Sequence, residues 1–162
     1  YKFGKYREEI ASSIRNKNPY KFISSSNFIC RKDILLNTLK KIETKSYGGD
    51  YIFGSLLRQD KINIIHIDNN VVIEDIDDNQ KFIRKTENAL ENLLKCYKKG
   101  LLNKHSISIL SAYKFLEKFF LKKIFVKSTD LVNNIIENNL VNQNPNLFLF
   151  DLYRLRYLCQ LK

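Results

Sequence analysis

The stretch "SYGGDYIFGSLL", Ser46 to Leu57, decides how this chain is read, because two adjacent glycines precede a lone carboxylate. The chain has 162 residues and only five glycines, yet Gly48 and Gly49 stand together. After Asp50, apolar side chains recur at the spacing of a buried helix face. The pattern therefore predicts a helix with Asp50 at its N-cap or in its first turn.

The residues alone leave two interpretations of Asp50 open. Glycines permit a positive φ and let the backbone approach a ligand closely. The dipole of a helix favours the charged form of a carboxylate at its N-terminus. These properties suit a general base that takes a proton from a hydroxyl group. The alternative is a helix cap after a tight turn, which contributes about 1 kcal/mol of stability, and this pattern alone favours the cap.

The segments on either side of this stretch predict strands. Loose alternation in "YKFISSSNFICRK" predicts a strand over 21–30. The β-branched run "KINIIHI" predicts another over 61–67, and after the turn signal "DNN" the stretch "VVIED" predicts a third over 71–75. The first half of the chain is therefore expected to be a mixed α/β structure.

Helical periodicity accounts for most of the remaining chain. Asp77 or Asp78 is placed to cap a long helix, and Gly100 ends it at the position that a C-cap glycine takes. The second half reads as helices throughout, separated by Asn, Pro, Ser and Thr. Beyond the helix of the opening stretch, helices are predicted at 5–16, 32–43, 78–99, 104–125, 129–140 and 146–161.

The net charge of +11 is concentrated in the second half, where the range 95–127 contains nine lysines and one acid, Glu117. Such a patch attracts phosphates on nucleic acid, nucleotides or anionic lipid. A solvated helix face is the more common origin of the pattern. Nucleic acid is disfavoured as a partner, because the lysines accompany no helix-turn-helix, zinc motif or aromatic RNA-binding sequence.

The stretch "KFLEKFFLKKIFVK", residues 114–127, places phenylalanines beside lysines. One interpretation is a helical subdomain that packs on the α/β core or forms a contact between two copies of the chain. The other is a peripheral foot on an anionic inner membrane. The sequence favours the first.

Cysteines and histidines predict neither a disulfide framework nor a zinc site. Cys30, Cys96 and Cys159 are far apart and form no C-x-x-C motif. His66 and His105 are the only histidines, and His66 lies in an apolar run where a packing role is the expected one. A reduced, cytoplasmic setting follows, and no run of about 18 uncharged apolar residues predicts a membrane span.

The order of the segments resembles the C-terminal half of family 2 glycosyltransferases of the GT-A fold, especially those of Bacteroidetes-type bacteria. The resemblance covers roughly residues 1–100. The segments that carry it are "NPYKFISSSNFICRKDIL", "YGGDYIFG", "KINIIHIDNNVVIE" and "FIRKTENAL". The second stands where the family has a loop often written Y-G-x-E-D-x-x-F-G.

The resemblance implies an α/β fold, with the acceptor-side part of a GT-A domain at 1–100 and a helical C-terminal extension at 101–162. It implies an inverting transfer from a nucleotide-diphosphate sugar to a hydroxyl of a glycan or lipid-linked acceptor, in polysaccharide biosynthesis. Asp50 would be the catalytic base. The implied substrate-binding residues are Ser26, Asn27, Tyr47, Gly48, Gly49 and Lys85.

The chain departs from the family pattern at several points. The Glu that precedes the family's Asp is Gly49 here, and Val72, Ile73 or Glu74 stands where the family often has a histidine. The family's nucleotide-binding half, with its Asp-x-Asp motif, has no counterpart, and we interpret "DIDD" at 75–78 as a capping loop. A divalent cation, Mg²⁺ or Mn²⁺, is therefore expected to be held mainly by residues outside this chain.

Two alternatives to an enzyme remain: a basic nucleic-acid-binding domain, and an assembly domain that needs a partner and performs no catalysis. If a base exists but is not Asp50, the acidic loop is the next place to look. The expected location is cytoplasmic or peripheral at the inner membrane. The acidic-loop candidates for a base are Glu74, Asp75, Asp77 and Asp78.

Overall fold

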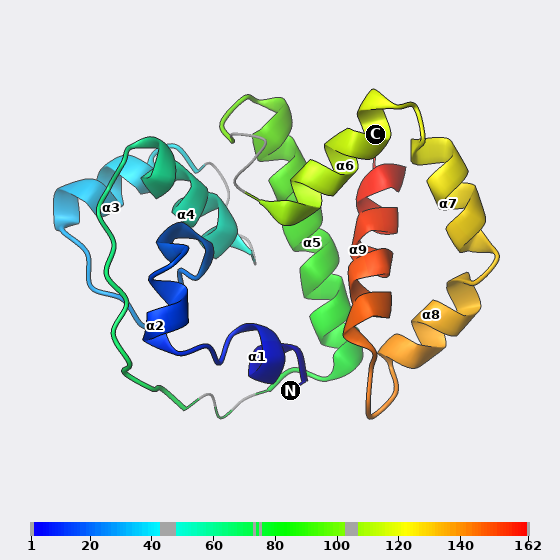
Figure 1. The fold of residues 1–162 in the computed structure, drawn as a ribbon, viewed down its shortest axis with the longest axis horizontal. Helices are drawn as coiled ribbons and strands as arrows, with labels where there is room; N and C mark the ends of the chain where they lie inside the picture. Colours follow the sequence, from blue (N-terminus) through cyan, green and yellow to red (C-terminus); the bar gives the residue numbers. More distant parts are fainter. Residues whose placement is uncertain (1, 43–47, 73, 75, 103–106, 162) are drawn as a thin grey trace.

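The computed structural model describes residues 2–42, 48–72, 74, 76–102 and 107–161, and all regular structure in these ranges is helical. Helices α5 and α9 stand side by side in the middle, with α2, α3 and α4 on one side and α7 and α8 on the other (Figure 1). The helices are α1 (Lys2–Arg7), α2 (Ser12–Arg15), the 3₁₀ helix η1 (Pro19–Lys21), α3 (Lys32–Leu39), α4 (Gly49–Gln59), α5 (Asn79–Lys98), α6 (Ser108–Lys118), α7 (Lys122–Asp130), α8 (Asn133–Leu140) and α9 (Leu147–Gln160).

The predicted α/β fold of a GT-A domain is wrong for the described residues, which contain no strand. Residues 19–21 form η1, and 22–31 have no regular structure. Residues 61–72 are irregular as well, and Ile73 and Asp75 lie outside the described residues. A strand exists only when a neighbouring strand completes its hydrogen-bond ladder, and the part of the chain that the structure describes contains no strand beside these segments.

The segment 61–67 nevertheless keeps the side-chain alternation of a strand. Ile64 and His66 are half-buried, whereas Ile65 and Ile67 are 76% and 70% exposed. The backbone of His66 pairs with the side-chain amide of Asn16: the N–H donates to Oδ1 at 2.8 Å, and the C=O accepts from Nδ2 at 2.9 Å. A side chain thus occupies the place that a neighbouring strand would take.

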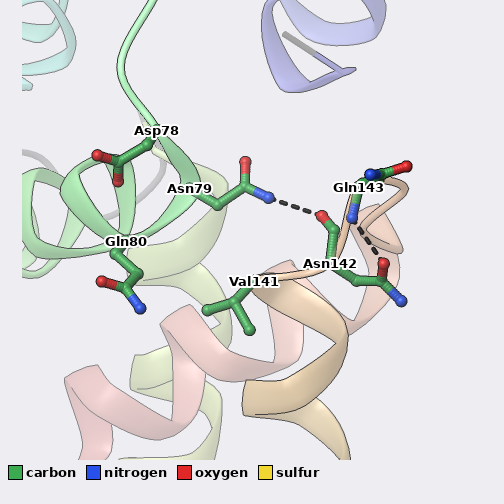
Figure 2. A pocket seen from close by; sticks show the side chains of 6 residues that line it. All are labelled: Asp78, Asn79, Gln80, Val141, Asn142 and Gln143. Atoms are coloured by element: carbon green, nitrogen blue, oxygen red, sulfur yellow. Dashed lines mark hydrogen bonds between the residues drawn. The ribbon is translucent and has the colours of Figure 1, made fainter.

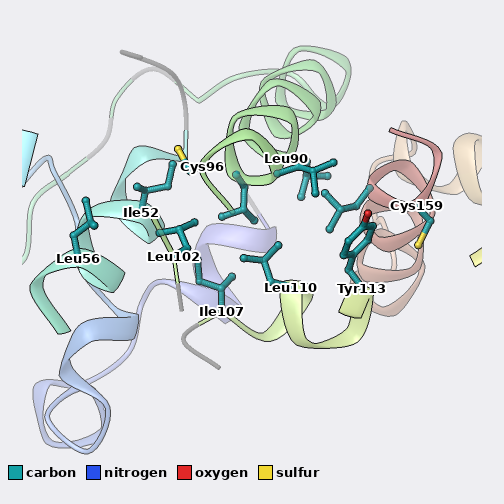
Figure 3. Close-up of a cluster of buried hydrophobic side chains, with 12 residues drawn as sticks. Ile52, Leu56, Leu90, Cys96, Leu102, Ile107, Leu110, Tyr113 and Cys159 are labelled. Atoms are coloured by element: carbon teal, nitrogen blue, oxygen red, sulfur yellow. The ribbon is translucent and has the colours of Figure 1, made fainter. Parts of the chain in front are cut away.

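The predicted buried face of α4 is confirmed. Ile52, Phe53, Leu56 and Leu57 are between 1% and 7% exposed. Ile52 and Leu56 belong to a cluster of buried side chains that also draws on α5, α6 and α9 (Figure 3). Its members are Ile52, Leu56, Leu90, Leu93, Leu94, Cys96, Leu102, Ile107, Leu110, Tyr113, Leu158 and Cys159.

Helices α5 and α9 run parallel and are joined by two hydrogen bonds with the same spacing on each helix. The Tyr153 hydroxyl donates to Glu87, and one turn later the Tyr157 hydroxyl donates to Glu91 at 2.8 Å. Beside them lies a second buried cluster, made of Ile136, Leu140, Phe150 and Tyr153. Helix α9 therefore contributes to both clusters.

The predicted helix ends are confirmed in part. Asp78 caps α5 by accepting the Lys81 N–H at 2.7 Å, and Gly100 ends it with a φ of +74°. The helix predicted over 104–125 is divided between α6 and α7, with a turn at Phe120, whose φ is +57°. The prediction over 5–16 likewise covers the end of α1 and the separate helix α2.

The predicted division at residue 100 stays a prediction. Leu94, before the boundary, and Leu110, after it, belong to the same buried cluster. The three cysteines are free thiols, as predicted, with Cys96 and Cys159 buried. Within the described ranges, no helix combines the length and apolar character needed to cross a membrane.

Candidate functional site

Gly48 is held against α5 in a backbone conformation that favours glycine. It is the N-cap of α4 and has a φ of +79°. A Cβ at this position would lie 2.6 Å from the Cβ of Ala89, which is closer than real Cβ contacts. The segment "YGGDYIFG" therefore depends on a small residue here to meet "FIRKTENAL".

Gly54 makes an equally close approach to the segment "NPYKF". A Cβ on Gly54 would lie 2.2 Å from the backbone oxygen of Tyr20. Nearby, the rings of Phe28 and Phe53 pack in a tilted arrangement with their centroids 5.8 Å apart. Three segments that are distant in sequence thus meet along α4.

Asp50 lies half-buried in the first turn of α4, as the sequence predicted. Glu8, which follows α1, is close enough to interact with its charge. The Glu8 side chain is exposed, but neighbouring atoms displace part of the water around its carboxyl group. This desolvation, followed by the negative charge of Asp50, raises the pKa of Glu8. The two carboxyl groups therefore form an electrostatically coupled pair.

Arginines from the two ends of the chain complete the surroundings of this pair. Tyr51 is 42% exposed, yet partial loss of water around its hydroxyl raises the pKa of that group, as do the charges of Glu8 and Asp50, while the charges of Arg154 and Arg7 lower it. Asp151 accepts from Arg7 at 2.7 Å and from Arg154 at 3.3 Å. The charges of Arg154, Glu8, Asp50 and Arg7 thus all act on the Tyr51 hydroxyl.

Ser26 and Asn27 lie in the irregular segment after η1, and their contacts are structural. The Ser26 hydroxyl is 2.8 Å from that of Ser24. The Asn27 amide donates to the Asn69 carbonyl at 2.6 Å, which ties this segment to the extended one. Gly49 is the first residue of α4 and has open space around its Cα. Tyr47 lies outside the described residues.

Lys85, the predicted substrate-binding residue on α5, forms an ion pair with Asp77 at 2.5 Å. Asp77 also accepts from Lys81 at 2.8 Å. Hydrogen bonds from Lys81 and Lys85 lower the pKa of Asp77. Two cations stabilise the charged form of Asp77, and Asp78 caps α5, so both serve in local structure.

A shallow depression of about 360 Å³ lies between the N-terminus of α5 and the turn that joins α8 to α9 (Figure 2). It is open to solvent, and most of its lining is amide. The Asn79 amide donates across it to the Asn142 carbonyl at 2.7 Å. The depression is lined by Asp78, Asn79, Gln80, Val141, Asn142 and Gln143. Asp78, an alternative candidate for the base, lines the depression, whereas Asp50 does not.

The described residues do not provide a metal site. They contain no group of three His, Cys, Asp or Glu side chains gathered closely enough to hold an ion. His66 instead donates from Nε2 to the Pro19 carbonyl at 2.8 Å. The divalent cation stays a prediction that concerns residues outside this chain.

Sequence reasoning did not predict that the charge of Glu8 interacts with Asp50, or that the charge of Arg154 acts on Tyr51. Glu8 lies 42 positions before Asp50, and Arg154 lies 104 positions after it. No motif spacing links such distant residues. Tyr51 alone carried a signal, since it follows Asp50 directly in the glycine-rich stretch.

Comparisons with known proteins add no relative. No family model matches the chain, and no curated protein and no solved structure is significantly similar to it.

Proposed function

We propose that this chain supplies the acceptor-activating carboxylate of a glycosyltransferase, with Asp50 as the general base. The observation that supports the proposal is the meeting of three segments of the family-like order around α4. Gly54 lies against Tyr20, and Gly48 against Ala89. These contacts fix the helix whose first turn carries Asp50. The proposal rests on this local assembly and on the resemblance of the segments, and it does not require an α/β fold.

In the proposed reaction, the Asp50 carboxylate accepts the proton of an acceptor hydroxyl. The hydroxyl oxygen forms a new bond to the anomeric carbon of the donor sugar. The bond from that carbon to the nucleoside diphosphate breaks at the same time, and the nucleoside diphosphate leaves with the electron pair. Attack opposite to the leaving group inverts the anomeric configuration.

Glu8 supports the role of Asp50 within the carboxyl pair. Desolvation and the charge of Asp50 raise the pKa of Glu8, so Glu8 keeps its proton to higher pH than an ordinary glutamate. The negative charge of Asp50 thus acts on a second carboxyl group near the head of α4.

The test is Asp50→Asn in the full-length protein, assayed for transfer from nucleotide-diphosphate sugars. Loss of a general base is expected to lower the transfer rate by about 10²–10⁴-fold. Stability is expected to fall by at most about 1 kcal/mol, because Asn also suits a helix N-terminus. Asp60→Asn at the other end of α4, where Asp60 pairs with Lys41 at 2.7 Å, is the control. Transfer near the wild-type rate in Asp50→Asn would refute the proposal.

A specific observation also favours the second candidate, an assembly domain that needs a partner. Ile65 and Val72 on the extended segment are 76% and 88% exposed. Exposed β-branched side chains on an extended backbone suit the addition of a strand from another chain. The test is the molecular mass in solution of the wild type and of a variant with Ile65→Thr and Val72→Thr. A monomeric wild type that performs transfer would exclude this candidate.

A further inference from the structure

The turn between α6 and α7 exposes large apolar side chains beside lysines. We name this surface the α6–α7 tip. Phe120 is 89% exposed, Ile124 65% and Phe115 58%. The turn lies at the edge of the molecule, beyond the C-terminal end of α9 (Figure 1). The tip consists of Phe115, Lys118, Phe119, Phe120, Lys123 and Ile124.

Phe120 combines this exposure with a strained backbone. It follows α6 at the position where a left-handed residue closes the helix, and its φ is +57°. The N–H of Leu121 donates to the Leu116 carbonyl at 2.8 Å, which completes the closing motif. Glycine is the usual residue at this position, and a side chain costs about 1–2 kcal/mol there.

Phe120 is not among the described residues that form the two buried clusters or pack against them, so burial in the core does not offset its strain. Lys61 takes the equivalent position after α4, with a φ of +53°, but an exposed lysine is well hydrated. An aromatic ring in the same position bears both the backbone strain and the unfavourable exposure of its surface to water. A strained residue that is also an exposed aromatic motivates a hypothesis of function at this turn.

The charge around the tip is positive. Lys118, Lys123 and Lys127 are exposed, and Lys118 lies over the ring of Phe119 at 5.6 Å from its centroid. Glu117, the one acid between residues 95 and 127, already accepts a hydrogen bond from Tyr113 at 3.2 Å and lies 3.7 Å from Lys122. The tip therefore presents apolar rings surrounded by cations.

The ammonium group of Lys122 contributes to this positive charge and is held in place by Tyr113. It donates to the Tyr113 hydroxyl at 2.8 Å, and its ammonium lies 4.6 Å from the centre of that ring. Burial opposes the charged form, but the hydrogen bond to Tyr113 and the nearby negative charges raise the pKa of Lys122. It therefore remains a cation at neutral pH.

We propose that the α6–α7 tip docks on an anionic lipid bilayer, with Phe120 inserted at the level of the headgroups. Lysines at the rim meet anionic headgroups while the phenylalanines and Ile124 enter the boundary with the acyl chains. The charge complements an anionic surface, and a turn at the edge of the molecule suits a flat bilayer. The proposal does not depend on the reaction proposed above.

The first test is binding of the wild type and Phe120→Gly to phosphatidylglycerol vesicles at low salt. The wild type is expected to bind, to release steeply as salt rises, and to bind phosphatidylcholine vesicles much more weakly. Phe120→Gly is expected to bind about tenfold or more weakly, yet to melt about 3 °C higher because glycine relieves the strain. Phe148→Ser, at another side chain that is 72% exposed, is the control and should bind as the wild type does.

The second test reports insertion directly, because the sequence contains no tryptophan. In Phe120→Trp, vesicles are expected to shift the emission to the blue, and brominated lipids are expected to quench it. In Phe148→Trp, neither change is expected. An unchanged spectrum of Phe120→Trp on vesicles that bind the protein would overturn the proposal.

A third comparison tests whether position or only net charge matters. Changing Lys118, Lys123 and Lys127 to Gln is expected to weaken binding by about fivefold per lysine. The matched control changes the exposed Lys17, Lys32 and Lys40 to Gln. Equal weakening in the two triple variants would overturn the proposal. Absence of vesicle binding at low salt, or a dimer in solution that Phe120→Gly dissociates, would also overturn it.

Discussion

Gly54 lies so close to the backbone carbonyl of Tyr20 that a Cβ added to the glycine would be 2.2 Å from the oxygen. The nearest atom belongs to the backbone of Tyr20, so no side-chain rotation can make room for a Cβ. Helix α4 and the 3₁₀ helix η1 are therefore in direct backbone contact at this point. The position of Asp50, one turn earlier on the same helix, depends on that contact.

Gly54→Ala is expected to lower the free energy of unfolding by about 3 kcal/mol. The new methyl group forces α4 and η1 apart, and this cost exceeds the gain in helix propensity. Gly49→Ala is the matched control, because nothing lies within 4 Å of a Cβ there, and its effect should be small. Urea unfolding of both variants checks the prediction, and equal stabilities would contradict it.

Gly48→Ala and Gly100→Ala separate steric conflict from backbone strain. Both glycines have a positive φ, +79° and +74°, but only Gly48 faces a neighbour, the Cβ of Ala89 at 2.6 Å. We expect Gly100→Ala to cost about 1–2 kcal/mol and Gly48→Ala to cost about 1–3 kcal/mol more. A double-mutant cycle with Ala89→Gly should recover most of the difference. A cycle without coupling would show that the Ala89 contact does not matter.

Glu8 is expected to make stability depend on pH in the acid range. Its pKa in the folded chain is raised above the usual 4.5 by desolvation and by Asp50, so the folded state holds the proton more tightly than the unfolded state. The free energy of unfolding therefore falls as pH rises from 4.5 through the folded-state pKa. Glu8→Gln should melt higher than the wild type at pH 7.

The same variant should lose its advantage below pH 4, where Glu8 is protonated in both states. In a chain that keeps Glu8, Asp50→Asn should reduce this loss of stability with rising pH, because it removes one of the two causes that raise the pKa of Glu8. Glu9→Gln serves as the neighbouring control. The measurement is the melting temperature between pH 3.5 and 7. If the wild type and Glu8→Gln show parallel curves of melting temperature against pH, Glu8 does not contribute to the pH dependence and the prediction is refuted.

Tyr157 is expected to make stability depend on pH in the alkaline range. Burial and the hydrogen bond to Glu91 raise the pKa of Tyr157 to about 12 from the usual 10, so the folded state again holds the proton more tightly. Stability should fall as pH rises from 10 to 12. Tyr157→Phe should cost about 1 kcal/mol at pH 8 and should make this alkaline fall shallower. Tyr6→Phe, at a tyrosine 65% exposed, is the control.

The helices that the sequence predicted well are those with a strong periodic face and clear end signals. In α5, Asp78 and Gly100 mark both ends, and Leu90, Leu93 and Leu94 form the buried face. The strands were predicted wrongly because alternation describes one chain segment, whereas a strand needs a partner. Residues 62–67 alternate as a strand does, but Asn16 takes the hydrogen-bonding place of a second strand.

For the candidate site, the sequence identified the position of Asp50 but not its surroundings. The glycine-rich turn and the apolar face of α4 are local features, so they could be predicted. The proximity of Glu8 and Arg154 depends on the packing of helices from opposite ends of the chain, which no local pattern encodes. The ion pair between Lys85 and Asp77 was also not predicted. Lys85 lies on α5, and Asp77 lies eight positions earlier, just before that helix begins.

Helix α9 has a consequence for how the chain acquires its structure during synthesis. Leu158 is fully buried in one cluster and Phe150 is 5% exposed in the other, so neither core is complete until α9 has left the ribosome. The hydroxyl contacts between α9 and α5 join residues 66 positions apart, and closing so long a loop slows folding. A nascent chain that ends before α9 therefore exposes the apolar faces of α5 and α8, and it is the form of this protein most in need of a chaperone.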